Sequence, residues 1–470
     1  YLMTDRVTDR GNSPESRDIA HVLHPYTNLA THEVTGPQIV TKGRGVYVTD
    51  ESGKEYIEGL AGLWCASFGF AEEELVNAAT EQLRTLPYYH SFAGKSVHPA
   101  IDLAERLKEI APVEFSKIFF ANSGSEANDS AVKMVWYFNN ARGTPKKKKF
   151  ISRLRGYHGV TVASGSLTGL PYAQADFDLP LDFVRHTMTP DYYRGAEAGE
   201  SEEDFASRCA QALEDMILEE GPETVAAFIA EPVMGAGGVI VPPKTYFEKI
   251  QAVLKKYDVL MIADEVICGF GRTGNMWGSQ TFGIKPDILT CAKALSSAYL
   301  PISAVMISEE IFQGLRGNSE KLGLFGHGYT YSAHPACAAV AVRTQELMQE
   351  RDIIGHVKAV SPHFQNRIAA LGDHALVGQA RGVGLIGAVE IVSDKETKRS
   401  YDPAAKVGAL IQNTAQEHGL ITRAMPGDIV GFCPPLIIAP NEIDEMFDRF
   451  TRAMDETEMQ LKQQGASAAQ

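Results

Sequence analysis

Short runs of apolar residues with no polar face constrain the fold of this chain more than any other feature. Residues 225–230 read VAAFIA and residues 259–263 read VLMIA. A strand that is apolar on both faces needs cover on both sides, and segments with helical periodicity lie between the runs. This alternation predicts an α/β fold with a mostly parallel sheet. We expect strands at 117–120, 150–153, 225–230, 259–263, 288–291 and 302–307, and helices at 101–110, 126–138, 205–220 and 246–257.

The two ends of the chain have a different pattern from its middle. The first 35 residues are polar and mixed and suggest an arm or a short helix, followed by a hairpin strand at 45–50. Beyond residue 335 a long helix (336–350) leads to a strand-like segment (387–392), a helical segment (404–417) and a terminal amphipathic helix (442–461). We therefore expect an N-terminal arm with part of a small domain (1–64), a large domain (65–335) and a C-terminal small α+β domain (336–470).

Length and net charge indicate a protein with a large core that does not bind nucleic acid or membranes. The chain has 470 residues, 44% of them hydrophobic, and a formal net charge of −15. This is enough for a large core. An acidic chain is poorly suited to bind nucleic acid or anionic membranes, so neither is expected as a partner.

The cysteines, histidines and N-terminus point to a cytoplasmic enzyme without a metal. The six cysteines include no C-x-x-C, and no H-E-x-x-H or other defensible ligand spacing occurs. The chain begins with Tyr1, and the first residues lack the apolar core of a signal peptide. No apolar stretch approaches the ~18 residues of a membrane span.

Two chemically useful side chains follow the apolar runs. Asp264 ends the run at 259–263, and Lys293 follows the run at 288–291. In an open α/β sheet the ligand crevice lies at the carboxyl ends of the strands, which would bring both to one site. A buried lysine can form a Schiff base with a carbonyl cofactor, and a carboxylate can keep a ring nitrogen protonated. Taken singly, Asp264 could be a turn residue and Lys293 an ordinary lysine.

A small polar segment at 122–129 (NSGSEAND) follows a strand and opens a helix. Free N–H groups and the positive end of the helix dipole at such a place bind phosphate. An ordinary N-cap by Ser123 or Ser125 is the alternative. The literal G-x-G-x-x-G at 382–387 is not a dinucleotide site, because a strand rather than a helix follows it; a glycine-rich turn is the better interpretation.

Together these segments resemble class III aminotransferases of the fold-type I pyridoxal phosphate (PLP) enzymes, especially their ω-amine:pyruvate branch. The resemblance extends from about residue 20 to residue 460. It rests on an ordered set of segments: 122–129 (NSGSEAND), 155–159 (RGYHG), 230–233 (AEPV), 264–274 (DEVICGFGRTG), 292–293 (AK), 328–335 (GYTYSAHP) and 421–423 (ITR).

The resemblance implies a seven-stranded, mostly parallel sheet, a smaller α+β domain and roles for individual residues. Lys293 would hold PLP as a Schiff base and take part in proton transfer at the substrate carbon. Asp264 would pair with the ring nitrogen. The other residues implied to bind the cofactor are Ser123, Gly124, Ser125, Tyr157, His158, Glu231 and Val266, with Tyr329 and Thr330 reaching the phosphate from the second subunit of a homodimer, which could pair further into a tetramer.

The resemblance also suggests how substrates are selected. Arg423 would bind the carboxylate of the keto acid and move aside for an uncharged amine; a surface arginine in a loop is the alternative. Relatives that act on ornithine, acetylornithine or 4-aminobutyrate typically carry glutamine where this chain has Ile267, which disfavours those activities. The expected aromatic lining is Trp64, Tyr89, Phe92, Tyr157 and, more weakly, Tyr26.

The expected activity is transfer of an amino group from a primary amine or ω-amino acid to pyruvate, by a ping-pong mechanism that gives a carbonyl product and alanine. An aminomutase or a decarboxylating transaminase would use the same cofactor. A binding protein without catalysis on the same fold is a further alternative, which the presence of both Asp264 and Lys293 disfavours.

Overall fold

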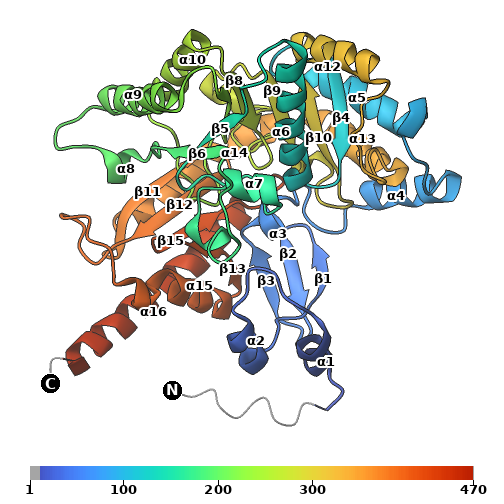
Figure 1. Ribbon diagram of the computed structural model, residues 1–470. Coiled ribbons are helices and arrows are strands. Elements are labelled where there is room, and N and C mark those ends of the chain that lie inside the picture. Colours follow the sequence, from blue (N-terminus) through green and yellow to red (C-terminus); the bar gives the residue numbers. More distant parts are fainter. Residues whose placement is uncertain (1–10, 469–470) are drawn as a thin grey trace.

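The computed structural model describes residues 11–468. Its largest element is a seven-stranded sheet with the order β4-β10-β9-β8-β7-β5-β6 (Figure 1). Only β10 runs antiparallel to its neighbours, so the mostly parallel seven-stranded sheet is confirmed. The strands are β4 (Lys117–Ala121), β5 (Lys149–Arg153), β6 (Val184–Thr187), β7 (Val225–Ala230), β8 (Leu260–Asp264), β9 (Ile288–Cys291) and β10 (Ser303–Ile307).

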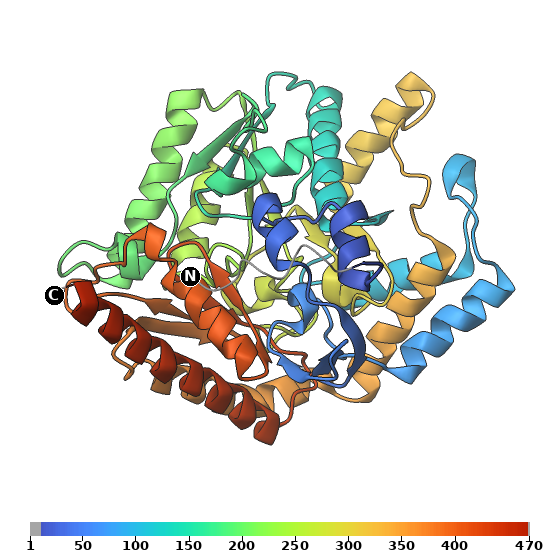
Figure 2. The ribbon, with the colours of Figure 1, turned by 90° about the horizontal axis from the view of Figure 1, so that it is seen from below.

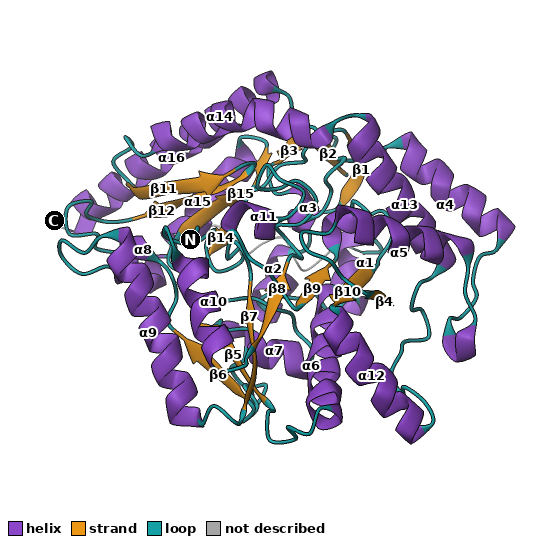
Figure 3. Ribbon diagram, turned by 90° about the horizontal axis from the view of Figure 1, so that it is seen from above, coloured by secondary structure: helices purple, strands orange, loops and turns teal. Residues whose placement is uncertain are grey.

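Both faces of this sheet are buried, as the doubly apolar runs predict. Ile229 and Ile262 pack on one face with residues of α6 and α12, whereas Phe228 and Met261 pack on the other with residues of α9 and α10. The sheet therefore lies between helices (Figure 3). The helices of this region are α5 (His98–Ile110), α6 (Gly124–Ala141), α7 (Val162–Leu167), α8 (Tyr192–Gly195), α9 (Glu202–Glu220), α10 (Tyr246–Lys256), α11 (Gly278–Phe282) and α12 (Glu309–Leu322).

The C-terminal region forms a second layer of helices on a four-stranded antiparallel sheet of order β11-β12-β15-β14. Helices α14 and α15 contact this sheet, and α16 packs against both of them (Figure 2). The elements are α13 (Pro335–Glu350), α14 (Ile353–Leu371), β11 (Val377–Val383), β12 (Ile386–Ile391), α15 (Val407–Glu417), β14 (Arg423–Met425), β15 (Ile429–Phe432) and α16 (Pro440–Ala468).

The N-terminal segment joins this C-terminal region in space. Strand β13 (Leu420–Ile421) pairs in parallel with β3 (Glu55–Glu58) and completes a sheet of order β1-β2-β3-β13. The assignment of residues 1–64 to an arm and part of a small domain stays a prediction. The other elements here are α1 (Pro14–His21), α2 (Leu29–Thr35), β1 (Val40–Arg44), β2 (Tyr47–Asp50), α3 (Ala61–Trp64) and α4 (Glu73–Thr85).

The glycine-rich segment at 382–387 is a hairpin turn. Gly384 has φ +59° between the antiparallel strands β11 and β12. Gly382 belongs to the preceding strand, which the sequence pattern did not indicate. No helix follows the glycines, so the segment has no dinucleotide-binding geometry.

Two further observations concern the cysteines and the helices. All six cysteines are free thiols. Within residues 11–468, every helix is too short or too polar to cross a membrane.

Candidate active site

A pocket of about 380 Å³ opens where β8 and β9 end and α6 begins. Its volume lies in the range of about 300–1,000 Å³ that is usual for small-molecule sites. It therefore occupies the crevice expected at the carboxyl ends of the sheet strands. The lining includes Leu63, Cys65, Asn122, Ser123, Gly124, Ser125, Asn128, Tyr157, His158, Gly159, Glu231, Asp264, Val266, Ile267, Ala292, Lys293, Ser296, Ala298, Leu300, Pro301 and Ile302.

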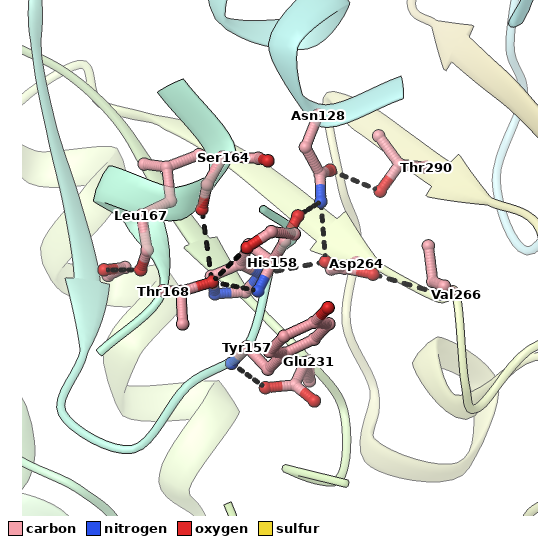
Figure 4. A network of polar contacts seen from close by, with 12 residues as sticks. Asn128, Tyr157, His158, Ser164, Leu167, Thr168, Glu231, Asp264, Val266 and Thr290 are labelled. Carbon is pink, nitrogen blue, oxygen red and sulfur yellow. Dashed lines mark hydrogen bonds and ion pairs between the residues drawn. The ribbon is translucent and has the colours of Figure 1, made fainter. Parts of the chain in front are cut away.

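Asp264 is fixed by three hydrogen-bond donors at the floor of this pocket (Figure 4). Nδ1 of His158 lies 2.8 Å from its Oδ2, and the Asn128 side-chain amide donates to the same oxygen over 2.9 Å. The main-chain N–H of Val266 donates to Oδ1 over 3.1 Å. The three donors thus hold the carboxylate in one orientation.

These donors keep Asp264 ionised despite its burial. Burial by itself raises the pKa of a carboxyl group. The hydrogen bond and charge of His158, together with the donors from Asn128 and Val266, outweigh burial and hold the pKa of Asp264 below its ordinary value. A permanently charged carboxylate is the group required to hold a ring nitrogen in its protonated form.

Asn128 belongs to the site, although no role was assigned to it from the sequence. Its amide nitrogen also donates to the carbonyl of His158 over 2.7 Å, and its oxygen accepts from Thr290 over 2.9 Å. It therefore ties α6 to β9 and to the loop of His158. The signal was helical spacing, because Asn128 lies one turn after Gly124 on the same helix.

Lys293 follows β9 directly and faces the same pocket. Its φ of +47° is left-handed, which is uncommon for a residue with a side chain and turns the chain sharply after the strand. Burial lowers the pKa of Lys293, while the charge of Asp264 acts in the opposite direction. A lowered pKa raises the fraction of neutral amine, the form that acts as nucleophile or base.

The start of α6 forms another part of the pocket wall. Ser123 is the N-cap, since its hydroxyl accepts from the N–H of Glu126 over 3.2 Å. The hydroxyl of Ser125 accepts from the N–H of Val160 over 3.1 Å. A Cβ added at Gly124 would lie 3.1 Å from the methyl groups of Val266. The glycine therefore lets the start of α6 come close to the Val266 side chain. Ser123 is thus both an ordinary cap and part of the pocket wall.

Glu231 holds the main chain that carries Tyr157. Its two carboxyl oxygens accept from the N–H of Tyr157 over 2.9 Å and from that of Gly235 over 3.0 Å. Burial raises the pKa of Glu231. Its position supports a structural role beside the site, and Tyr157 itself lines the pocket.

Arg423, Tyr26 and Tyr172 lie close enough to Tyr157, a residue of the pocket wall, for their charges to act on its hydroxyl. Burial raises the pKa of the Tyr157 hydroxyl, as does the neighbouring Tyr26, against the positive charge of Arg423. The ring of Tyr26 packs edge-on against Tyr172 at 6.1 Å between centroids. Arg423 opens β14 and is half-buried. Within residues 11–468 no carboxylate lies at ion-pair distance from its guanidinium.

Other residues expected at the site lie outside this pocket in a single chain. Trp64 is buried in a core cluster, although its neighbours Leu63 and Cys65 line the pocket. Tyr89 and Phe92 line a second cavity of about 1,190 Å³. Their roles in substrate binding stay predictions. No sequence pattern predicted that Leu63 and Cys65, rather than Trp64 between them, would line the pocket.

The two residues expected to act in the second subunit also lie elsewhere in their own chain. The Tyr329 hydroxyl is hydrogen-bonded to Ser130 and donates to the carbonyl of Glu126, over 3.1 and 3.2 Å. Thr330 is exposed, and its carbonyl accepts from Tyr88 over 2.8 Å. This placement is compatible with contact to a second chain, which stays a prediction.

The donor set fits PLP. The helix N-terminus at Gly124 and Ser125 suits a phosphate, Asp264 suits a protonated ring nitrogen, and Lys293 suits an aldehyde carbon. Tyr157 and Val266 line the same pocket and would help to hold the ring. When bound, PLP supplies a carbonyl carbon for amines and a ring that accepts electrons. Lys293 would hold it and move a proton at the substrate carbon, and Asp264 would keep the ring charged.

The chain is similar to curated proteins over almost its whole length. It is 50% identical over 443 residues to γ-aminobutyrate transaminase 1, mitochondrial, of Solanum lycopersicum, covering 94% of this chain and 86% of the relative. It is 51% identical over 438 residues to γ-aminobutyrate transaminase 1, mitochondrial, of Oryza sativa subsp. japonica, covering 93% and 85%.

Solved structures and a family match lead to the same conclusion. The ω-transaminase of Pseudomonas jessenii in complex with PMP, the amino form of PLP, superposes with a TM-score of 0.94 at 56% identity, covering 95% of this chain and 98% of that one. A thermostable six-fold mutant of that enzyme gives a TM-score of 0.94 at 55% identity, covering 95% and 98%. Residues 29–454 match the family Aminotransferase class-III. The chain therefore belongs to the class III aminotransferases, enzymes of fold type I that use PLP.

Proposed function

We propose that this aminotransferase moves an amino group from a terminal primary amine or ω-amino acid to pyruvate, giving a carbonyl product and alanine. The observation that carries the proposal is the half-buried guanidinium of Arg423, which has no carboxylate partner within the described residues and lies close enough to Tyr157 to act on its ionisation. A cation that is partly removed from water and has no partner loses free energy of solvation. A substrate carboxylate supplies that partner through two parallel hydrogen bonds.

The comparisons support pyruvate as the acceptor. Solved relatives include ω-transaminases at 55–56% identity. Another, described as a transaminase with L-alanine, is 53% identical and covers 90% of this chain. Alanine is the aminated form of pyruvate, so a site that accepts one in the reverse direction accepts the other in the forward direction.

The curated relatives favour 4-aminobutyrate as the first donor to test. They are named γ-aminobutyrate transaminases at 50–51% identity. The substitution Ile267 was expected to disfavour this substrate, but relatives so similar in sequence weaken that argument. The Ile267 side chain is buried and packs in a cluster with Val233 and Val239. The amine of 4-aminobutyrate would reach Lys293 while its carboxylate meets Arg423.

The chain's own residues account for selectivity between charged and neutral partners. Arg423 binds carboxylates at the mouth, and Tyr157, Tyr26 and Tyr172 offer apolar ring surface beside it. A neutral amine would use the ring surface alone. We expect carboxylate-bearing substrates to bind more tightly than neutral amines of equal size.

We further propose a homodimer located in the cytoplasm. The second cavity, lined by Tyr89, Phe92 and Gly328, carries exposed aromatic side chains; Tyr89 is 43% and Phe92 47% exposed in the single chain. Exposed apolar clusters of this kind mark interfaces. A partner chain seated there would cover them and bring Thr330 near its phosphate site.

A donor and acceptor panel tests the proposed reaction. The holoenzyme is incubated with 4-aminobutyrate, β-alanine, a polyamine and an aromatic amine, each with pyruvate, 2-oxoglutarate or glyoxylate. We expect alanine from pyruvate in amounts equal to the carbonyl product. Carbon dioxide release would indicate a decarboxylating transaminase, and an isomerised amine without alanine would indicate an aminomutase. Faster turnover with 2-oxoglutarate than with pyruvate would overturn the acceptor assignment.

A further inference from the structure

Three metal-binding side chains converge in the N-terminal arm, far from the catalytic lysine in sequence. Asp18 lies on α1, His32 on α2, and His24 in the loop between these helices. Nε2 of His24 lies 2.7 Å and Nε2 of His32 lies 3.0 Å from the same oxygen, Oδ1 of Asp18. The two imidazole rings are 4.2 Å apart between centroids.

We propose that Asp18, His24 and His32 form a binding site for one Zn²⁺ ion. The three ligand atoms lie within 4.8 Å of one another. Bonds of about 2.0–2.2 Å to Zn²⁺ place neighbouring ligand atoms about 3.0–3.5 Å apart, so small side-chain rotations would admit the ion. Two imidazoles and one carboxylate match the nitrogen and oxygen ligands of zinc sites with open positions for water. Sequence patterns did not indicate this site, because the spacing of the three residues matches no known metal motif.

The environment of the three side chains favours an ion over a chance surface contact. Their side chains are 21%, 27% and 11% exposed, in the order Asp18, His24 and His32. The two imidazoles compete for one oxygen of Asp18. A metal ion would instead bind one atom of each of the three side chains. Both histidines can bind through Nε2 as the neutral tautomer with the proton on Nδ1.

The ion would fasten the loop that reaches the active site. This loop, residues 22–28, carries Tyr26, whose side chain lies near the Tyr157 hydroxyl and whose ring packs on Tyr172. Asp18 and His32 lie on the helices before and after the loop, and His24 lies within it. Coordination would therefore close the loop across its base and restrict the motion of Tyr26 at the substrate mouth.

Zinc titration of the holoenzyme tests the site. The protein is treated with a chelator, desalted, checked for retained PLP and titrated with Zn²⁺ in a calorimeter. We expect one strong site per chain, weakened at least tenfold in His32→Ala and in Asp18→Asn. His21→Ala is the matched control, because His21 is an exposed histidine on α1 outside the cluster, and it should bind Zn²⁺ like the original protein.

Two further measurements keep the test decisive if a variant loses its arm structure. Co²⁺ should give ligand-field absorption bands that change in His24→Ala, a substitution in the loop. Zn²⁺ should also slow tryptic cleavage after the exposed Arg17 in the original protein but not in His32→Ala. Zinc binding of equal strength in the original protein and His32→Ala, with unchanged Co²⁺ bands in His24→Ala, would overturn the proposal.

Discussion

Nδ1 of His158 lies 2.8 Å from Oδ2 of Asp264, and both side chains are almost completely buried. The carboxylate is therefore held in place by a buried neighbour. Nε2 of His158 has no hydrogen-bond partner within the described residues. The histidine thus offers one nitrogen to the carboxylate, and its effect on the site is exerted through Asp264.

Replacing His158 should make Asp264 harder to ionise. His158→Phe removes the hydrogen bond and charge that offset burial, so the pKa of Asp264 should rise. Asp264 is active when charged, which means that activity is lost as the pH falls through its pKa. The acid limb of the pH–activity profile should therefore move to higher pH. His158→Asn, which retains a donor, should move it less, and an unchanged profile in His158→Phe would contradict this account.

Loss of the Lys293 amine should abolish transamination. Among the described residues, Lys293 is the only lysine that lines the pocket, and Lys293→Ala removes this proposed nucleophile and proton carrier. We expect turnover to fall by at least about 10³-fold, and borohydride to leave no covalently attached cofactor. The exposed Lys285 provides a control, because Lys285→Ala should retain full activity and labelling. Wild-type turnover in Lys293→Ala would end the assignment.

Arg423 should affect carboxylate substrates more than neutral amines. Arg423→Ala is expected to raise the KM for pyruvate by about 10–100-fold, the value of a charge-assisted hydrogen bond of roughly 1.5–3 kcal/mol. The KM for a neutral aromatic amine should change less than threefold. Arg423→Lys should recover part of the loss, and the exposed Arg452→Ala should have no effect. Equal changes for both substrate types would refute the assigned role.

The buried carboxyl of Glu265 should make stability depend on pH. Burial raises its pKa from 4.5 to about 7, although it accepts hydrogen bonds from the N–H groups of Gly278 and Ser279. The folded state therefore holds more protons than the unfolded state between about pH 4.5 and 7, and stability falls as the pH rises through this window. The contribution is on the order of 3 kcal/mol.

Glu265→Gln removes this titration. The decrease in Tm between pH 5 and pH 8 should be smaller in the variant than in the original protein, as measured by differential scanning calorimetry. Glu248→Gln, a change at an exposed position on α10, should leave the decrease unaltered. If the two variants have the same pH dependence of Tm, Glu265 does not titrate as described.

Phe92 tests whether the second cavity is a subunit interface. Phe92→Glu places a charge among the aromatic side chains of that cavity, and burying it against a second chain would be costly. We expect a shift from dimer to monomer in sedimentation or light scattering, together with weaker PLP retention. Leu322→Glu changes an exposed apolar residue outside the cavity and should leave both properties intact. A monomeric variant with undiminished cofactor affinity would exclude a shared site.

Much of the fold could be predicted because its central strands have an unambiguous pattern. The strand expected at 225–230 is β7 (Val225–Ala230), and all six of its residues are buried. The edge strand β6 (Val184–Thr187) reads VRHT and was missed, since a half-exposed edge lacks the continuous apolar pattern. Strands β13 and β14 are too short to leave a pattern and exist because other segments pair with them.

By itself, the sequence predicted the class of fold and the candidate pair Asp264 and Lys293, because each follows a run of apolar residues and strand ends in such sheets meet at one crevice. Only the tertiary structure decided which side chains surround that pair. It brought His158 and Asn128 onto Asp264 from different elements. It also left Arg423 without a carboxylate partner among the described residues and gathered Asp18, His24 and His32 in the arm. These contacts join residues that are distant in sequence or irregularly spaced, and local periodicity carries no information about such contacts.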